Sequence, residues 1–318
     1  PDGSMQKRSK TFYFSKHGAV IVKPDAGLEW TKAGVTVLAD PNRNNTRLIE
    51  QWIGIGKARN VDELKAAVGR TVGLPWVNII AADRAGNTFF ADASVVPSVP
   101  PERFASDCLL VPPMLMFDGA RGTCDWGASQ PALAGIMSPA NGSLTMRTDY
   151  VGNSNDSYWL TNPRALLTGP APHGYSPLYG GVRKEQKLRT RIGFKQMEEA
   201  IARRVRLQLE DVKQLAFANR VHAAELVLPD LLHACRGAID SHVSKACAVL
   251  GAWDMRADLD SRGAVLFREY WKAAATIPGK WAIPFDPNDP VNTPRGIRPA
   301  ALPAMLAGLK PAAQKLEE

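Results

Sequence analysis

Gly152-Asn-Ser-Asn-Asp-Ser-Tyr-Trp-Leu-Thr-Asn-Pro163 is the most informative stretch of this sequence. It gathers small amide, hydroxyl and carboxylate side chains in one loop and follows them with two aromatic residues. Amide groups in such a loop can donate hydrogen bonds to an oxyanion that develops during acyl transfer. The same residue types also form Asx turns that only hold a tight loop in shape, and composition alone favours that interpretation.

The composition is that of a folded globular protein. Of the 318 residues, 45% are hydrophobic and 22% are charged, and the formal net charge is +8. This length predicts two domains or one large one. No apolar run approaches the ~18 residues that a membrane-spanning helix needs, so we expect no membrane span.

The excess of basic residues does not indicate a nucleic-acid partner. Nucleic-acid-binding proteins cluster their positive charge on one face. The densest basic segment here, residues 183–206, also contains Glu185, Glu198 and Glu199. We therefore interpret it as a solvated helix face and expect no binding to nucleic acid.

The two parts of the chain differ in character. Before residue 193 the sequence consists of short strands and turns, and its clearest hairpin joins residues 76–82 to residues 88–91 through a turn at residues 83–87. Within the first part, we expect a helix at residues 61–68 with Asn60 as its N-cap. From residue 194 onward helical periodicity dominates. We predict an α+β fold with a strand-rich part at residues 1–192 and a helical part at residues 193–318. The expected helices of the second part cover residues 194–207, 209–218, 223–235, 241–253, 262–275 and 300–318.

Residues 153–163 resemble a signature of the penicillin acylase family, and more closely its acyl-homoserine lactone acylase and aculeacin A acylase branch. Four further segments resemble family motifs in the same order along the chain. They are Phe12-Tyr-Phe-Ser-Lys-His-Gly18, Pro75-Trp-Val-Asn-Ile-Ile-Ala-Ala-Asp-Arg-Ala-Gly-Asn87 continued by Ala91-Asp-Ala-Ser-Val-Val-Pro97, Leu188-Arg-Thr-Arg-Ile192 and Phe285-Asp-Pro-Asn-Asp-Pro-Val-Asn-Thr-Pro294.

The resemblance implies an N-terminal-nucleophile (Ntn) hydrolase with an αββα sandwich, of which this chain would be part of the β subunit. Such enzymes mature by autocatalytic cutting, which exposes a Ser whose hydroxyl attacks the amide carbonyl. The α-amine of that Ser serves as the base, which is reasonable because its pKa is about 8.

The resemblance also implies roles for individual residues. Asn155 matches the asparagine that donates to the oxyanion. Arg183 fits the spacing of an arginine that orients this site, with Arg189 and Arg191 as open alternatives. For the acyl-binding pocket, Tyr158, Trp159 and residues 112–117 are candidates, and ordinary core packing is the alternative for most of them.

This sequence departs from the family pattern at its start. Pro1 has no hydroxyl and cannot be the nucleophile, so we expect the Ser to lie on a segment outside this sequence. The expected partners are therefore an α subunit and the remaining β-subunit segment. We expect no cofactor, because the position of a calcium-binding carboxylate in penicillin G acylases falls here at Leu166.

The implied function is hydrolysis of an amide to release an acyl chain. We expect an N-acyl-homoserine lactone as substrate, which is quorum quenching, with a β-lactam antibiotic or lipopeptide side chain as the alternative. A non-catalytic structural subunit or binding module is the alternative of another class. Because the family is exported, we expect a periplasmic or secreted protein.

The four cysteines form two local pairs and no CxxC motif. Two short-range disulfides and four reduced thiols are both compatible with composition. The export of the family favours the disulfides Cys108–Cys124 and Cys235–Cys247.

Overall fold

The computed structural model describes residues 3–99, 101–111, 115–127, 133–170, 174–203 and 206–317. The chain divides into two compact units. The first unit comprises Pro1–Thr148 with Gly169–Tyr179, and the second comprises Asp149–Thr168 with Gly180–Glu318. The boundary that we predicted at residues 192 and 193 lies inside a helix of the second unit.

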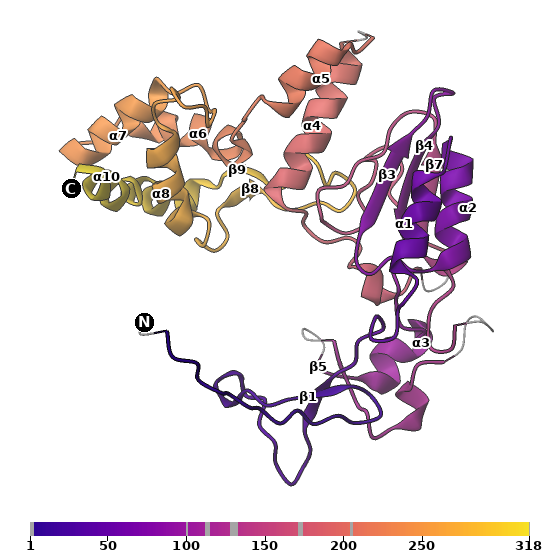
Figure 1. Cartoon of the computed structure of the whole chain (residues 1–318). Helices are drawn as coiled ribbons and strands as arrows, with labels where there is room; N and C mark the ends of the chain where they lie inside the picture. The colour runs from indigo at the N-terminus through magenta and orange to yellow at the C-terminus, as the bar shows by residue number, and fades with distance from the viewer. Residues whose placement is uncertain are drawn as a thin grey trace. The chain divides into compact units, whose positions relative to one another are not determined.

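Helices and strands are distributed as the sequence predicts, with the strands mostly early and the helices mostly late (Figure 1). The strands are β1 Ala19–Ile21, β2 Thr36–Leu38, β3 Asn78–Ala82, β4 Thr88–Asp92, β5 Leu109–Val111, β6 Met116–Phe117, β7 Ser143–Arg147, β8 Trp281–Ile283 and β9 Arg295–Ile297. The helices are α1 Leu48–Gly56, α2 Val61–Thr71, α3 Pro101–Arg103, α4 Leu188–Ala202, α5 Leu209–Ala216, α6 His222–Cys235, α7 Ser241–Gly251, α8 Ala264–Ala274, α9 Leu302–Ala307 and α10 Leu309–Glu317.

The first unit is built on an antiparallel sheet with the strand order β3-β4-β7. The hairpin that we predicted is present: Asn78 pairs with Asp92, and Ala82 pairs with Thr88. Asp83 closes its turn, because the carboxylate accepts hydrogen bonds from the backbone N–H groups of Ala85 at 2.9 Å and Asn87 at 3.0 Å. The three further sheets of the described residues pair β1 with β2, β5 with β6, and β8 with β9.

Helix α2 covers this sheet, and apolar side chains of the helix and the sheet form a common core. Asn60 caps the helix as predicted, since its side chain accepts a hydrogen bond from the backbone N–H of Glu63 at 2.9 Å. Apolar residues of α2 pack against the inward side of β4. The buried members of this core are Val61, Leu64, Val68, Leu74, Phe89, Ala91 and Ala93.

The second unit has a helical core. Helices α6, α7, α8 and α10 pack together, with the β8–β9 hairpin beside α6 (Figure 1). The most deeply buried side chains of this core include Val227, Leu231, Leu250, Met305 and Leu309. None of the helices in the described ranges is long and apolar enough to cross a membrane.

Helix α4 begins at Leu188, earlier than the start at residue 194 that we expected. The backbone N–H of Lys187 donates to the Asp156 carboxylate at 2.8 Å, and the Thr190 hydroxyl donates to it at 3.1 Å. The start of the helix is therefore fixed by a contact with the loop of residues 153–163. Helical periodicity alone cannot reveal such a contact.

Candidate active site

The loop of residues 153–163 is closed at its base within the second unit. The backbone N–H of Gly152 donates to the carbonyl of Thr161 at 2.9 Å. The Asn162 side chain donates to the carbonyl of Tyr150 at 2.8 Å. A Cβ atom on Gly152 would lie 3.0 Å from the Phe194 ring, so glycine allows the loop to approach α4 closely.

A second set of contacts ties both ends of the loop to α4. The hydroxyl of Tyr150 donates to Glu198, and Arg164 donates to the same carboxylate through Nε at 3.1 Å and Nη2 at 2.8 Å. Burial raises the pKa of Tyr150, and the neighbouring Glu198 raises it further, so the hydroxyl keeps its proton. None of these three residues was predicted from the sequence as part of the site.

Asn155 lies exposed at the turn of the loop, in a left-handed backbone conformation with φ 56°. Its backbone N–H donates to the Asn153 side-chain oxygen at 2.8 Å, which is an Asx turn. The Arg189 guanidinium donates to the Asn155 side-chain oxygen at 3.2 Å and to the Ser154 carbonyl at 2.6 Å. Arg189 therefore holds both the backbone and the side chain of the turn.

This contact determines which way the Asn155 amide faces. Guanidinium groups only donate hydrogen bonds, so Arg189 must contact the oxygen of the amide and not its nitrogen. The NH2 group consequently points away from Arg189. Within the described part of the chain, no acceptor binds it.

The three candidate arginines occupy different environments. Arg189 contacts Asn155, as described above. Arg191 is fully buried and donates to the carbonyls of Val291 at 3.0 Å and Pro294 at 2.9 Å. Arg183 is exposed and has no partner among the residues described, but its backbone is left-handed with φ 55°. Such a conformation is uncommon for a long side chain and is concentrated at functional sites.

Tyr158 and Trp159 lie in the core of the second unit. Their exposed fractions are 2% and 1%. The Trp159 ring meets Phe285 edge-on at 6.4 Å between centroids and packs in a cluster with Leu160 and Phe194. Of residues 112–117, the first three lie outside the described residues; Leu115 is exposed and Met116–Phe117 form β6.

A surface groove of about 600 Å³ lies along α8. Its lining is mainly apolar and includes Val221, Phe267 and Trp271, together with the charged Arg268 and Lys272. None of the residues that the sequence analysis selected lines this groove.

The cysteines are bonded in the expected pairs, Cys108 with Cys124 and Cys235 with Cys247. Cys235 joins the end of α6 to α7. Among the residues that the structure describes, no three His, Cys, Asp or Glu side chains form a group that could hold a metal ion.

Comparison with known sequences identifies the family. Residues 2–318 match the sequence model of penicillin amidase, and the chain belongs to the penicillin amidase family. It is 38% identical over 309 residues to aculeacin-A acylase of Actinoplanes utahensis, covering 90% of this chain and 38% of that protein. It is 34% identical over 300 residues to the acyl-homoserine lactone acylase PvdQ of Pseudomonas putida, covering 93% of this chain and 37% of that protein.

A solved structure shows the same fold. The thermostable penicillin G acylase from Alcaligenes faecalis matches with a TM-score of 0.57 and 15% identity, covering all of this chain and 59% of that one. The predicted α+β Ntn-hydrolase fold is thereby confirmed. The chain spans only about two fifths of the length of its curated relatives.

Proposed function

We propose that this chain forms part of an Ntn amide hydrolase in which Asn155 stabilises the oxyanion. One observation carries the proposal: Arg189 binds the oxygen of the Asn155 amide and leaves its NH2 group free of acceptors among the described residues. An amide held in this way is ready to donate before the reaction begins. Such preorganisation is the source of oxyanion stabilisation.

The reaction follows from this arrangement and from family membership. The hydroxyl of an N-terminal Ser attacks the amide carbonyl carbon, and its proton passes to the α-amine of the same Ser. The carbonyl oxygen becomes an oxyanion and accepts a hydrogen bond from Asn155. Collapse of the intermediate expels the amine, which takes that proton, and leaves an acyl ester. Water then hydrolyses the ester by the same steps and releases the acid.

We propose an N-acyl-homoserine lactone as the first substrate. Relatives at 33–34% identity are acyl-homoserine lactone acylases, and the relative at 38% is an aculeacin-A acylase. A lipopeptide or β-lactam side chain is accordingly the second substrate class. The two disulfides favour an exported protein in an oxidising compartment, assembled with an α subunit and the segment that carries the Ser.

The first test replaces Asn155 in the purified protein. Loss of one oxyanion donor typically lowers kcat by about 10²–10³. We expect Asn155→Ala to lose about that much in the release of homoserine lactone from acyl substrates of graded chain length. Asn153→Ala is the comparison for loosening of the turn, because it removes an amide that shapes the loop and keeps the amide of Asn155. A rate within threefold of wild type for Asn155→Ala would contradict the proposal. Absence of hydrolysis of every acyl amide by the wild type would instead favour the non-catalytic alternative.

The second test separates the arginines. We propose Arg189 as the positioning residue for Asn155, and Arg183 remains a prediction from spacing. A hydrogen bond to a charged donor is worth about 1.5–3 kcal/mol, and exposure places this one at the low end. We therefore expect Arg189→Ala to lower kcat about tenfold or more with little change in KM, and Arg189→Lys to restore part of the loss. When Asn155 is already replaced by Ala, adding Arg189→Ala should lower kcat almost no further. If Arg183→Ala shows that coupling and Arg189→Ala does not, the assignment is reversed.

A further inference from the structure

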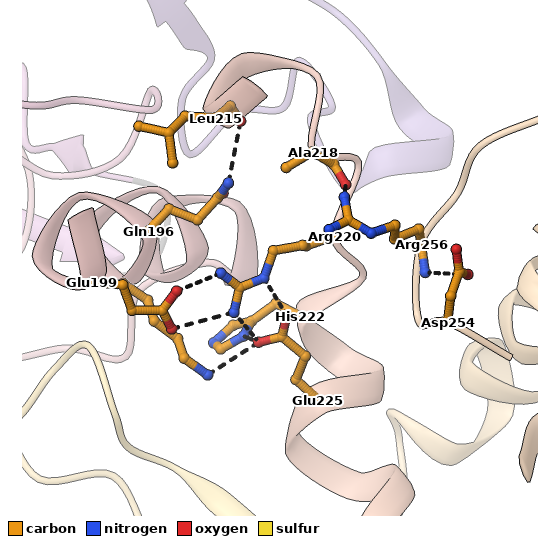
Figure 2. Close-up of polar contacts among 10 residues, drawn as sticks. Gln196, Glu199, Leu215, Ala218, Arg220, His222, Glu225, Asp254 and Arg256 are labelled. Carbon is orange, nitrogen blue, oxygen red and sulfur yellow. Dashed lines mark hydrogen bonds and ion pairs between the residues drawn. The ribbon is translucent and has the colours of Figure 1, made fainter. Parts of the chain in front are cut away.

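The first turn of α6 is joined to α4 by a cluster of charged side chains (Figure 2). Glu225 accepts hydrogen bonds from Lys195 at 3.1 Å, from Arg220 Nε at 2.6 Å and from His222 Nδ1 at 3.3 Å. Arg220 also donates to Glu199 of α4 at 2.7 Å. This cluster links the helix that carries Arg189 to the helical core.

The cluster fixes the tautomer of His222. Burial alone would raise the pKa of Glu225, but the hydrogen bonds from His222, Arg220 and Lys195 outweigh burial and leave its pKa below the usual range. The ionised carboxylate only accepts hydrogen bonds, so the proton of a neutral His222 must be on Nδ1. Nε2 then carries a lone pair and is an acceptor.

That acceptor is buried without a partner. His222 is 5% exposed, and Nε2 has no hydrogen-bond partner among the described residues. A buried polar atom left unpaired costs about 1–3 kcal/mol. The site therefore favours any small group that can donate to Nε2.

An unpaired donor lies on the facing helix. Arg191 is fully buried, and its Nη1 has no partner within the described ranges. Arg191 precedes Lys195 by one helical turn, so both side chains project from the same side of α4, where Lys195 reaches Glu225 of α6. Burial lowers the pKa of His222, and the positive charges of Arg191 and Lys195 lower it further, against the opposing effect of Glu225.

We propose that Arg191 Nη1 and His222 Nε2 bind one buried water molecule, which bridges α4 and α6 as an acid-sensitive joint. The ligand must accept from one group and donate to the other, and it must be neutral and small; water meets all three conditions. Protonation of His222 turns Nε2 into a donor, so the water must then accept from both groups, and a second positive charge lies near Arg191; both changes weaken the joint. The joint exists whatever reaction the protein catalyses.

The charges around His222 determine the direction of the pH response. From α4, Arg191 and Lys195 oppose its protonation, and Glu199 is neutralised by Arg220. From α6, Glu225 favours protonation but is shared with Arg220 and Lys195. The net effect keeps the folded state neutral at His222. Folding stability contributed by this group is therefore full above pH ~6.5 and is lost as the pH falls below that value.

The decisive measurement is the tautomer and titration of His222 in the purified protein. Nitrogen NMR of ¹⁵N-histidine-labelled protein should show a neutral Nδ1–H form at pH 7 that resists protonation below pH 6.5. A crystal structure at pH 7.5 should show one water within hydrogen-bond distance of both Nη1 and Nε2. A protonated His222 at pH 7, a neutral Nε2–H form, or a direct contact that excludes water would each overturn the proposal.

Unfolding experiments give an independent arm. The unfolding equilibrium constant of the wild type should rise by up to tenfold per pH unit below pH 6.5, through the extra proton bound by unfolded His222. His222→Gln should lose that component, whereas His233→Gln, at an exposed position of the same helix, should keep it. Equal slopes in all three proteins would refute the joint. If His222→Gln fails to fold, the NMR result on the wild type decides alone.

Discussion

Asp156 should stabilise α4, although it lies 31 residues before Lys187 at the start of that helix. Lys187 is the N-cap residue of α4, and its own side chain makes no capping hydrogen bond. The Asp156 carboxylate takes over this role by accepting from the Lys187 backbone N–H at 2.8 Å and from the Thr190 hydroxyl at 3.1 Å. We therefore expect Asp156→Ala to destabilise the protein as the loss of a helix cap does.

The size of the effect can be worked out from these two contacts. Loss of a capping acceptor costs about 0.5–2 kcal/mol. Loss of a negative charge at the helix N-terminus costs a further ~0.3–1 kcal/mol, and salt screens this second contribution. Asp156→Ala should therefore lower the free energy of unfolding by about 1–3 kcal/mol. Asp156→Asn keeps an acceptor and loses only the charge, so it should cost about 0.3–1 kcal/mol.

Urea unfolding followed by tryptophan fluorescence provides the assay, because Trp159 is buried three residues from Asp156. The cost of Asp156→Asn should shrink in 1 M salt, where the Debye length is about 3 Å. Asp260→Ala, at an exposed position of the second unit, is the control and should change the free energy by less than ~0.5 kcal/mol. If Asp156→Ala unfolds at the same urea concentration as wild type, the loop does not cap the helix and the reasoning fails.

Two further predictions concern the stability of the units. Replacing both Cys235 and Cys247 by Ser removes a disulfide with a sequence separation of 12, which should lower the free energy of unfolding by about 3 kcal/mol. Thermal unfolding of the double variant and of the oxidised wild type tests this, and equal midpoint temperatures would contradict it. In the first unit, burial raises the pKa of Asp92 to about 6, so the folded state binds the extra proton and loses stability as the pH rises from 3.8 to 6. In urea unfolding, Asp92→Asn should therefore have the same free energy of unfolding as the wild type at pH 4 and a higher one at pH 8. If the difference in free energy between the two proteins is the same at both pH values, this prediction is wrong.

The features that the sequence predicted correctly depend on short-range interactions. The turn at residues 83–87 is closed by the Asp83 side chain through contacts with residues two and four positions away. The cap of α2 joins Asn60 to Glu63. Both devices lie within one window of sequence, so residue types and spacing are enough to predict them.

The sequence alone could not show which of the three arginines contacts Asn155. The answer depends on where α4 begins, which the contact with Asp156 fixes. Once residues 188–202 are helical, Arg189 and Arg191 are separated by about 200° around the axis and must face opposite sides. One side meets the turn of Asn155, and the other is buried against the carbonyls of Val291 and Pro294. A helix beginning at residue 194 would have left both side chains without a defined direction.

In the function that we propose, the two interpretations of the loop, a set of Asx turns and an oxyanion site, apply to different residues of the same loop. Asn153 makes the turn, because its side-chain oxygen accepts the Asn155 backbone N–H. That turn places Asn155 in the left-handed conformation, which asparagine tolerates better than most residues. The Asn155 side chain therefore does not shape the loop: its oxygen accepts from Arg189, and its NH2 group has no acceptor among the described residues. A set of Asx turns does not require the Asn155 side-chain amide to be exposed. Its exposure therefore favours a catalytic role for Asn155.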